Sequence, residues 1–466
     1  MELKKKKFQV PHTYVIIGIL LAIITILTYI VPAGSFDRIE DAELGRTMVV
    51  QGLFKFIEQS PVSPFRMFMA IVEGMVSASD IIFFIFFAYG FVFLLIKTGA
   101  FYGSMGALIK KFKGKEAFIL PFFMIMFGIC GSTFGLYEEV YGLLPAFIGI
   151  AIALGYDGLV GGAAVVLGTV TGFAAATLNP FSIGIAQGIA GLPIGSGIGF
   201  RIICFIVFQG TAILYLMHYA KKVKANPEAS IVKGVKFKIS EGMTREDMEK
   251  LPFTGKHKLI MMLFVCTIAG LVYGTSQLGW YLTELSTLFL IMTIAIGLIG
   301  GFNLSQIANF FVEAVSDVIF GALVVGIARS LTIIMDEGKI IDTFVYYISS
   351  GLTNLSTSIA AIGMVIAQNI INFFIPSGSG QAATSMPIMV PLADAIGMNR
   401  QIAVLAFQFG DGFSNMFWPT VVATECGLMG LPIEKWYKFM TPLFITMVIL
   451  QFIMITISVL INYGPF

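Results

Sequence analysis

The chain has 466 residues, of which 57% are hydrophobic and only 12% charged, and its mean hydropathy is +0.90. A soluble protein carries about 25% charged residues, so the composition excludes a soluble globular domain and predicts a polytopic membrane protein. The net charge is +2, and the partners we expect are the lipid bilayer and a small-molecule substrate, with no nucleic acid.

Apolar runs near the ~20 residues that a membrane-spanning helix needs recur along the whole chain. We therefore predict an all-α protein. The expected spans lie at 14–31, 81–97, 117–129, 159–177, 199–218, 259–274, 285–300, 318–335, 359–374, 400–413 and 439–462.

The placement of Lys and Arg predicts the orientation, because basic loops stay on the cytoplasmic side. The N-terminus, the segment 110–115 and the loop 221–258 together hold 18 of the 29 Lys and Arg residues, whereas the segment 36–60 is net acidic. We expect a multi-pass protein of the cytoplasmic (inner) membrane with a cytoplasmic N-terminus. The apolar run 14–31 is longer than the roughly 7 to 15 residues of a signal peptide's apolar region, so it is expected to be the first transmembrane helix.

Two segments, 62–77 and 304–317, mix apolar with charged positions and are predicted to be interfacial amphipathic helices. Each precedes a span that opens near an acid, Asp80 or Asp317. These two acids are expected to be helix N-caps rather than ligands.

The first interruption of apolar sequence is Gly-Ser-Thr-Phe-Gly at 131–135, followed by Glu138 and Glu139. Backbone that leaves helical geometry within a membrane is tolerated only where it is buried in protein or lines a cavity. We therefore predict a re-entrant hairpin at 129–153, with Ser132, Thr133, Glu138 and Glu139 as candidate substrate ligands. An acid within the membrane indicates function, although the pair of acids could instead lie at the membrane surface.

A second interruption follows at 177–182, in the sequence Thr-Leu-Asn-Pro-Phe-Ser. Proline removes a backbone donor and frees carbonyls one turn upstream, and such carbonyls can coordinate Na⁺ together with an Asn oxygen. Asn179 is the candidate here, with a purely structural kink as the alternative.

The second half of the chain repeats this order of interruptions, in small matches such as Gly191-Leu192-Pro193 with Gly430-Leu431-Pro432. One additional helix between the halves would turn the second copy upside down, so we predict two inverted repeats, an arrangement typical of transporters. The expected organisation is a first repeat at 1–220, a cytoplasmic linker at 221–258, an extra linking helix at 259–282 and a second repeat at 283–466.

Arg329 lies within the predicted span 318–335. Its guanidinium could hold a substrate carboxylate in a bidentate manner. A buried salt bridge to Glu138, Glu139 or Asp411 is the other interpretation.

The second hairpin is predicted at 375–397, where Pro-Ser-Gly-Ser-Gly-Gln-Ala breaks the apolar sequence. Hydroxyls and free amides at the N-terminus of a half-helix suit an anionic ligand. Ser377, Ser379, Gln381 and Thr384 are the candidate ligands. Close helix packing through small residues is the alternative.

The last interruption, at 410–420, contains Asp411 and Asn415 before a Trp-Pro pair. Both are candidate polar ligands, and a structural kink is again the alternative. We expect no cofactor. A coupling ion, Na⁺ or H⁺, is expected in its place, with Na⁺ near Thr133, Asn179, Ser379 and Asn415.

The interruptions Gly-Ser-Thr-Phe-Gly-x-x-Glu-Glu, Leu-Asn-Pro-Phe, Pro-Ser-Gly-Ser-Gly-Gln-Ala and Gly-Asp-Gly-Phe-Ser-Asn resemble those of the YfcC-like branch of the DcuC (C4-dicarboxylate anaerobic carrier) family. The resemblance covers nearly the whole chain. It implies the ion transporter superfamily architecture, in which hairpins and discontinuous helices move like an elevator against a scaffold that forms a homodimer.

The expected function is secondary active transport of a small polar metabolite, most simply a basic amino acid that is taken up or exchanged by an antiporter. A C4-dicarboxylate is the alternative substrate, because the family name implies one. A doubly anionic substrate should meet more than one buried cation, and Arg329 is the one candidate that we identify. The chain has no Gly-x-x-x-x-Gly-Lys-Ser/Thr loop for ATP, and we expect neither an enzyme nor a channel.

Overall fold

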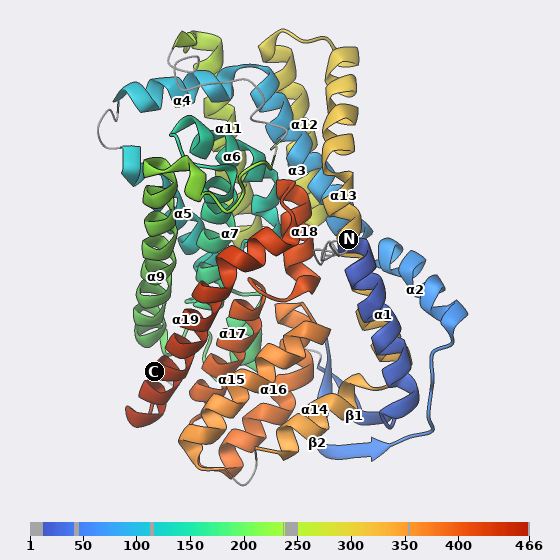
Figure 1. The fold of residues 1–466 in the computed structure, drawn as a ribbon. Helices are drawn as coiled ribbons and strands as arrows, with labels where there is room; N and C mark the ends of the chain where they lie inside the picture. Colours follow the sequence, from blue (N-terminus) through green and yellow to red (C-terminus); the bar gives the residue numbers. More distant parts are fainter. Residues whose placement is uncertain are drawn as a thin grey trace, which may run out of the picture.

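The computed structural model describes residues 13–41, 46–111, 116–235, 237, 250–352 and 355–464. The lysines at positions 4–7 and the middle of the predicted linker, 236 and 238–249, lie outside these residues. Nearly all of the secondary structure described is helical, as expected of a polytopic membrane protein (Figure 1). Six described helices are long and apolar enough to cross a membrane, namely Ser79–Lys97, Ile198–Ala225, Leu282–Gly300, Leu304–Glu337, Thr357–Phe374 and Ile433–Leu460.

The first half begins with one helix, a two-stranded β-hairpin and then a run of helices. Its elements are α1 (Thr13–Ile30), β1 (Gly34–Asp41), β2 (Arg46–Phe56), α2 (Pro64–Ser77), α3 (Ser79–Lys97), α4 (Ala100–Lys111), α5 (Ile119–Phe134), the 3₁₀ helix η2 (Glu138–Leu143), α6 (Leu144–Ala153), α7 (Gly158–Ala174), α8 (Ile183–Ile189) and α9 (Ile198–Ala225).

All of the described secondary structure in the second half is helical. Its elements are α11 (Gly255–Gln277), α12 (Leu282–Gly300), α13 (Leu304–Glu337), α14 (Ile341–Ser350), α15 (Thr357–Phe374), α16 (Gly378–Ala395), α17 (Arg400–Ser414), α18 (Pro419–Met429) and α19 (Ile433–Leu460).

The two halves carry the same order of elements in opposite orientations. A hairpin (α5, η2 and α6; α15 and α16), a broken helix (α7 and α8; α17 and α18) and a long helix (α9; α19) follow one another in each half. In Figure 1, α4 and α6 lie at the upper end, whereas their counterparts α14 and α16 lie at the lower end. The arrangement is that of an inverted repeat, with α11 as the extra helix between the copies.

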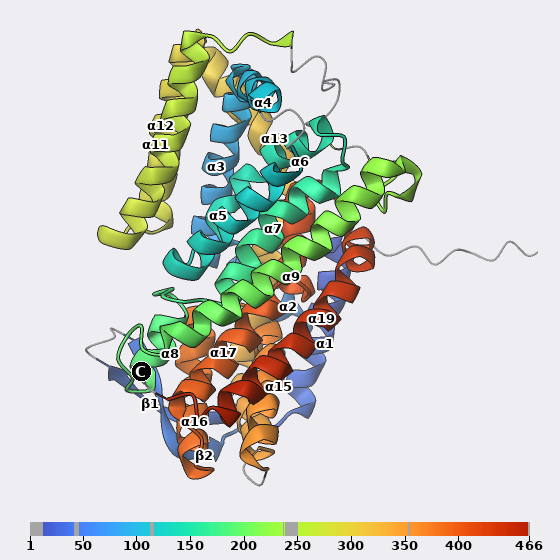
Figure 2. The ribbon, with the colours of Figure 1, turned by 90° about the vertical axis from the view of Figure 1, so that its left-hand side faces the viewer.

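The helices form two groups that pack side by side. One group contains α1, α2, α3, α11, α12 and α13, while the other contains both hairpins, both broken helices, α9 and α19. Figure 2 shows α11 and α12 on one side of the molecule and α9 and α19 on the other. Contacts between the groups run chiefly from α3 to hairpin 1 (119–153) and from α13 to α18.

Small residues bring the central helices into backbone contact within the second group. A Cβ added to Gly172 of α7 would collide with the carbonyl of Gly128 on α5, and one added to Gly412 of α17 would collide with Ala174 of α7. Lipid tails are as apolar as helix surfaces, so the hydrophobic effect does not drive helices together within a membrane. Close packing of this kind is therefore a main source of helix association.

The acidic segment near the N-terminus folds into a β-hairpin that the sequence pattern did not indicate. Strands β1 and β2 pair antiparallel, from Gly34 opposite Phe56 to Asp41 opposite Arg46. Asp342 in the first turn of α14 holds β1 in place, because its carboxylate accepts hydrogen bonds from Arg38 Nη2 (2.7 Å) and the Phe36 amide (3.0 Å). The hairpin therefore covers one end of the second repeat.

Three boundary predictions are wrong. Asp80 is not the N-cap of its helix, because α3 begins at Ser79 with Ala78 as its N-cap and Asp80 lies in the first turn. The segment 304–317 is not a separate interfacial helix but continues through 318–335 in α13, so Asp317 lies within a helix and is not its N-cap. With 34 residues at 1.5 Å each, α13 is about 51 Å long. The hairpins are also larger than 129–153 and 375–397, because each interruption is the tip between two arms and the preceding helix, α5 or α15, forms the first arm.

Candidate functional site

The tip of hairpin 2 (357–395) exposes the N-terminus of a half-helix. Ile375 and Pro376 leave helical geometry, and Ser377 is the extended N-cap of α16, with its Oγ accepting a hydrogen bond from the Gly380 amide at 3.3 Å. The first-turn amides of a helix carry a partial positive charge. An anionic group would therefore be stabilised at this tip.

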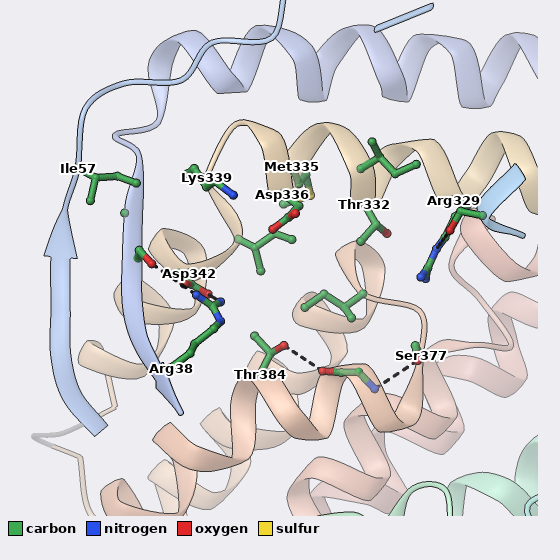
Figure 3. A pocket seen from close by; sticks show the side chains of 17 residues that line it. Arg38, Ile57, Arg329, Thr332, Met335, Asp336, Lys339, Asp342, Ser377 and Thr384 are labelled. Carbon is green, nitrogen blue, oxygen red and sulfur yellow. Dashed lines mark hydrogen bonds and ion pairs between the residues drawn. The ribbon is translucent and has the colours of Figure 1, made fainter. Parts of the chain in front are cut away.

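A cavity of about 470 Å³ lies between this tip and the first helix group. Figure 3 shows Arg329, Thr332 and Asp336 of α13 along one side, with Ser377 and Thr384 of hairpin 2 facing them. The β-hairpin closes a third side through Arg38 and Ile57, with Asp342 beside them. A volume of this size lies in the usual range for pockets that hold one small molecule, roughly 300 to 1,000 Å³.

The cavity presents side-chain charges of both signs. Arg38 is already paired with Asp342 at 2.7 Å. Arg329 is exposed in the cavity, and among the described residues its side chain makes one hydrogen bond, from Nε to Ser77 Oγ at a long 3.4 Å. Among the described residues, Arg329, Asp336 and Lys339 take part in no ion pair within 4.0 Å. A guanidinium, an ammonium and a carboxylate are therefore available to a ligand.

The alternative interpretation of Arg329, a salt bridge to Glu138, Glu139 or Asp411, is not found among the described residues. Glu138 and Glu139 instead open η2 at the tip of hairpin 1, where Glu139 Oε2 accepts a hydrogen bond from the Tyr137 amide at 2.8 Å. Both acids are half-buried and neither lines the cavity. Their tip packs against α3, where Gly142 lies against the backbone of Ala88.

Ser132 of hairpin 1 is hydrogen-bonded to the break between the two segments of the first broken helix. The carbonyl oxygen of Ser132 accepts hydrogen bonds from the amides of Thr177 (2.9 Å), Leu178 (3.1 Å) and Asn179 (3.1 Å), and its Oγ lies 3.0 Å from Thr177 Oγ1. Asn179 is fully buried, with Oδ1 accepting from the Phe181 amide at 2.9 Å and Nδ2 without a hydrogen-bond partner. The polar atoms of Ser132 are thus used for folding, while Asn179 keeps a free donor.

The second broken helix holds Asp411 beside the tip of hairpin 2. Asn372 of α15 donates from Nδ2 to Asp411 Oδ1 at 2.9 Å, which leaves Asp411 Oδ2 and Asn372 Oδ1 without hydrogen-bond partners. A Cβ added to Gly378 would lie 3.2 Å from Asp411 Oδ2 and 3.4 Å from the Cβ of Ser182, whose Oγ also has no partner. Oxygen atoms from both halves of the chain, of Ser182, Asn372 and Asp411, therefore lie in one buried region near Gly378.

Of the remaining predicted residues, Thr384 lines the cavity and the others do not. Thr133 and Thr384 bond to carbonyls of their own helices, Ile129 (2.6 Å) and Gly380 (2.9 Å). Gln381 donates to Gln368 on the other arm of hairpin 2. Asn415 is buried, with Oδ1 unpartnered, and Ser379 is half-buried near the tip. The structure therefore joins Arg329, Ser377 and Thr384 in one cavity and leaves the other candidates elsewhere.

Three polar residues of these regions were not among the sequence candidates. Asp336 directly follows the predicted span 318–335. Arg201 lies near the start of the predicted span 199–218. It is 1% exposed, however, and donates to the Thr177 carbonyl from Nη2 (3.1 Å) and to Tyr463 Oη from Nη1 (3.2 Å). Glu425 of α18 is buried, and its position as a lone acid in an apolar piece was the signal that could have identified it.

Comparison with known proteins places these features in a family context. The sequence profile of the DcuC family, the C4-dicarboxylate anaerobic carrier, matches residues 10–460. A protein of Escherichia coli (strain K12) named "Putative basic amino acid antiporter YfcC" is 30% identical over 475 residues, which cover 93% of each chain. An "Uncharacterized protein" of Haemophilus influenzae is 28% identical over 499 residues, which cover 98% of each chain.

Two solved transporter structures align with nearly the whole chain. The YdaH transporter of Alcanivorax borkumensis aligns with a TM-score of 0.44 at 12% identity, over 97% of this chain and 100% of that chain. MtrF of Neisseria gonorrhoeae, from a class of antimetabolite efflux pumps, aligns with a TM-score of 0.44 at 15% identity, over 97% of this chain and 96% of that chain.

Proposed function

The chain belongs to the DcuC (C4-dicarboxylate anaerobic carrier) family and is a membrane transporter, and we propose that it carries a basic amino acid across the cytoplasmic membrane by uptake or exchange. The observation that supports this most is the charge distribution of the cavity beside hairpin 2. The name of the E. coli relative points to the same class of substrate.

An amino acid brings one carboxylate and at least one ammonium group, and the cavity offers a group for each. The carboxylate suits Arg329, whose guanidinium points toward the tip of hairpin 2 in Figure 3. Charge-assisted hydrogen bonds from Arg to carboxylate are among the strongest in proteins. The ammonium suits Asp336, which lies within two helical turns of Arg329 on α13.

A C4-dicarboxylate is the second candidate, because Lys339 also lines the cavity. Its two carboxylates would meet Arg329 and Lys339, and Asp336 would then repel the ligand unless it were protonated or paired with Lys339. Arg38 is already neutralised by Asp342. Arg329, Lys339 and Asp336 together leave one positive charge in the cavity, which suits a ligand with a carboxylate, and Asp336 is the group that favours an amino acid over a ligand with two carboxylates.

Transport would follow from movement of one helix group against the other. The walls of the cavity come from both groups, since Arg329 belongs to α13 and Ser377 to hairpin 2. Displacement of the hairpin group would carry the ligand away from the β-hairpin, in the elevator manner that the family resemblance implies. Homodimerisation through the first helix group is part of the same proposal.

We assign a coupling Na⁺ to the buried oxygens around Asp411. Na⁺ prefers oxygen ligands from carboxylate, amide, hydroxyl and backbone groups. Asp411 Oδ2, Asn372 Oδ1 and Ser182 Oγ have no hydrogen-bond partner, and Gly378 brings the tip of hairpin 2 within contact of Asp411 and Ser182. Binding there would link the ion to the hairpin that holds the substrate.

The test is counterflow in proteoliposomes that contain the purified protein. Arginine, ornithine, citrulline, fumarate and succinate are compared, with and without Na⁺ and a pH gradient. Saturable counterflow of arginine or ornithine supports the proposal. Counterflow of succinate or fumarate alone would show that the substrate is a dicarboxylate and not a basic amino acid. Non-saturating flux would contradict a carrier mechanism.

The acids of hairpin 1 have a separate test. Replacing Glu138 or Glu139 by Gln should lower transport without loss of folded protein. Both acids lie in the tip of hairpin 1 that packs against α3, at the boundary across which the two helix groups would move. The readouts are counterflow rate and size-exclusion profile in detergent. Wild-type kinetics in both variants would remove the two acids from the transport cycle.

A further inference from the structure

Glu425 is a buried acid that none of the preceding functions uses. It lies on α18, the second segment of a broken helix, and is 1% exposed. Its Oε1 accepts a hydrogen bond from the hydroxyl of Tyr137 at 3.3 Å, and its Oε2 has no hydrogen-bond partner. Tyr137 belongs to the tip of hairpin 1, 288 residues away in the chain, so this one bond joins the two repeats.

The groups around Glu425 do not compensate a negative charge. From hairpin 1, Tyr137, Tyr141 and Glu138 interact with it electrostatically. Cys426 is its neighbour on α18, and Glu434 of α19 acts on that cysteine. The helices α13, α6, α1 and α19 also pack against α18, yet within the described part of the chain no cation lies within 4.0 Å of Glu425.

A carboxylate that is buried without a cation or a full set of donors is costly, and such a group takes up a proton instead. The protonated form fits the geometry on the page, because Oε1 can keep the hydrogen bond from Tyr137 while Oε2 carries the proton. The charged form would need water or further donors. Water becomes accessible when the two helix groups move against each other, because α18 and hairpin 1 are the parts of the second group that pack against α13 and α3 of the first.

We propose that Glu425 is a proton-carrying site of this transporter, loaded while α18 and hairpin 1 lie against α13 and α3, and emptied when the two helix groups move apart. The carboxylate takes one proton from water on one side of the membrane and returns it to water on the other side, and no other bond changes. The proposal rests on the transport function above but not on the identity of the substrate, nor on Na⁺ at Asp411.

The experiment uses proteoliposomes of the full-length protein with a pH-sensitive dye inside, and whichever substrate of the panel shows counterflow. Wild type should move protons when substrate is added, and a pH gradient should drive uptake. Glu425→Gln, which cannot release a proton, should keep substrate counterflow but lose both proton movement and uptake driven by the pH gradient. Glu434→Gln, an acid of the neighbouring helix α19, is the matched control and should behave as wild type.

Two results would overturn the proposal: substrate counterflow without proton movement in wild type, or uptake driven by the pH gradient that persists in Glu425→Gln. If Glu425→Gln shows no counterflow, Tyr137→Phe decides the matter. Loss of the hydrogen bond from Tyr137 should shift the pH at which uptake is half-maximal by about one unit. An unchanged midpoint in this variant would also overturn the proposal. Absence of counterflow for every substrate in wild type contradicts the proposed function instead.

Discussion

Replacement of Arg329 by Gln tests the substrate site with the least disturbance to the fold. The Arg329 side chain is exposed in the cavity, and its one hydrogen bond to a described residue is the long contact to Ser77 at 3.4 Å, so its removal should change folding stability little. A hydrogen bond to a charged group contributes roughly 1.5–3 kcal/mol, and about 1.4 kcal/mol corresponds to tenfold in affinity. We therefore expect the KM for an amino acid to rise about 10- to 150-fold.

The assay is initial-rate uptake in proteoliposomes over a range of substrate concentrations, with protein content matched by size-exclusion chromatography. Arg329→Lys should lie between wild type and Arg329→Gln, since it keeps the charge but loses the planar fork. The control is Lys55→Gln, an exposed cation of the β-hairpin that does not line the cavity. A KM in Arg329→Gln equal to that of the control would refute the assignment of the substrate carboxylate to Arg329.

Three further substitutions test separate parts of the account. Asp411→Asn should abolish stimulation of uptake by Na⁺ while leaving exchange in its absence, and stimulation equal to wild type would exclude Asp411 from the ion site. Gly135→Ala should lower the thermal unfolding temperature in detergent, because Gly135 has a φ of +73° and its Cβ would collide with Asn179. The left-handed conformation alone costs an alanine about 1–2 kcal/mol. The control is Gly199→Ala, which should leave the unfolding temperature unchanged because nothing lies within 4 Å of the added Cβ. Asp336→Asn should raise the KM for arginine more than that for succinate, measured by competition, and an equal change would argue against an ammonium site there.

The positions of the chain breaks were predictable from sequence because they are local. Gly135 takes a left-handed conformation at the tip of hairpin 1, and Ser377 caps α16 at the tip of hairpin 2. Both lie in the glycine- and hydroxyl-rich stretches that interrupt apolar sequence. The inverted order of the halves was also predictable, since it follows from one additional helix between two similar sets of elements.

The use of each polar group was not predictable, because it depends on contacts between distant segments. Ser132 looked like a ligand, yet its carbonyl and hydroxyl hold the segment around Thr177, 45 residues further on. Arg329 looked equally suited to a salt bridge or a ligand, and only the fold places it in a cavity with Asp336. Glu425 acquires its hydrogen bond from Tyr137 of the other repeat, which no local pattern encodes.

The central claim is that the cavity beside hairpin 2 belongs to a carrier for basic amino acids. It is tested most directly by counterflow of labelled arginine into proteoliposomes loaded with unlabelled arginine. We predict a transient accumulation above equilibrium that saturates with external arginine and is competed by ornithine but not by succinate. Linear, non-saturating entry, or competition by succinate and not by ornithine, would contradict the claim.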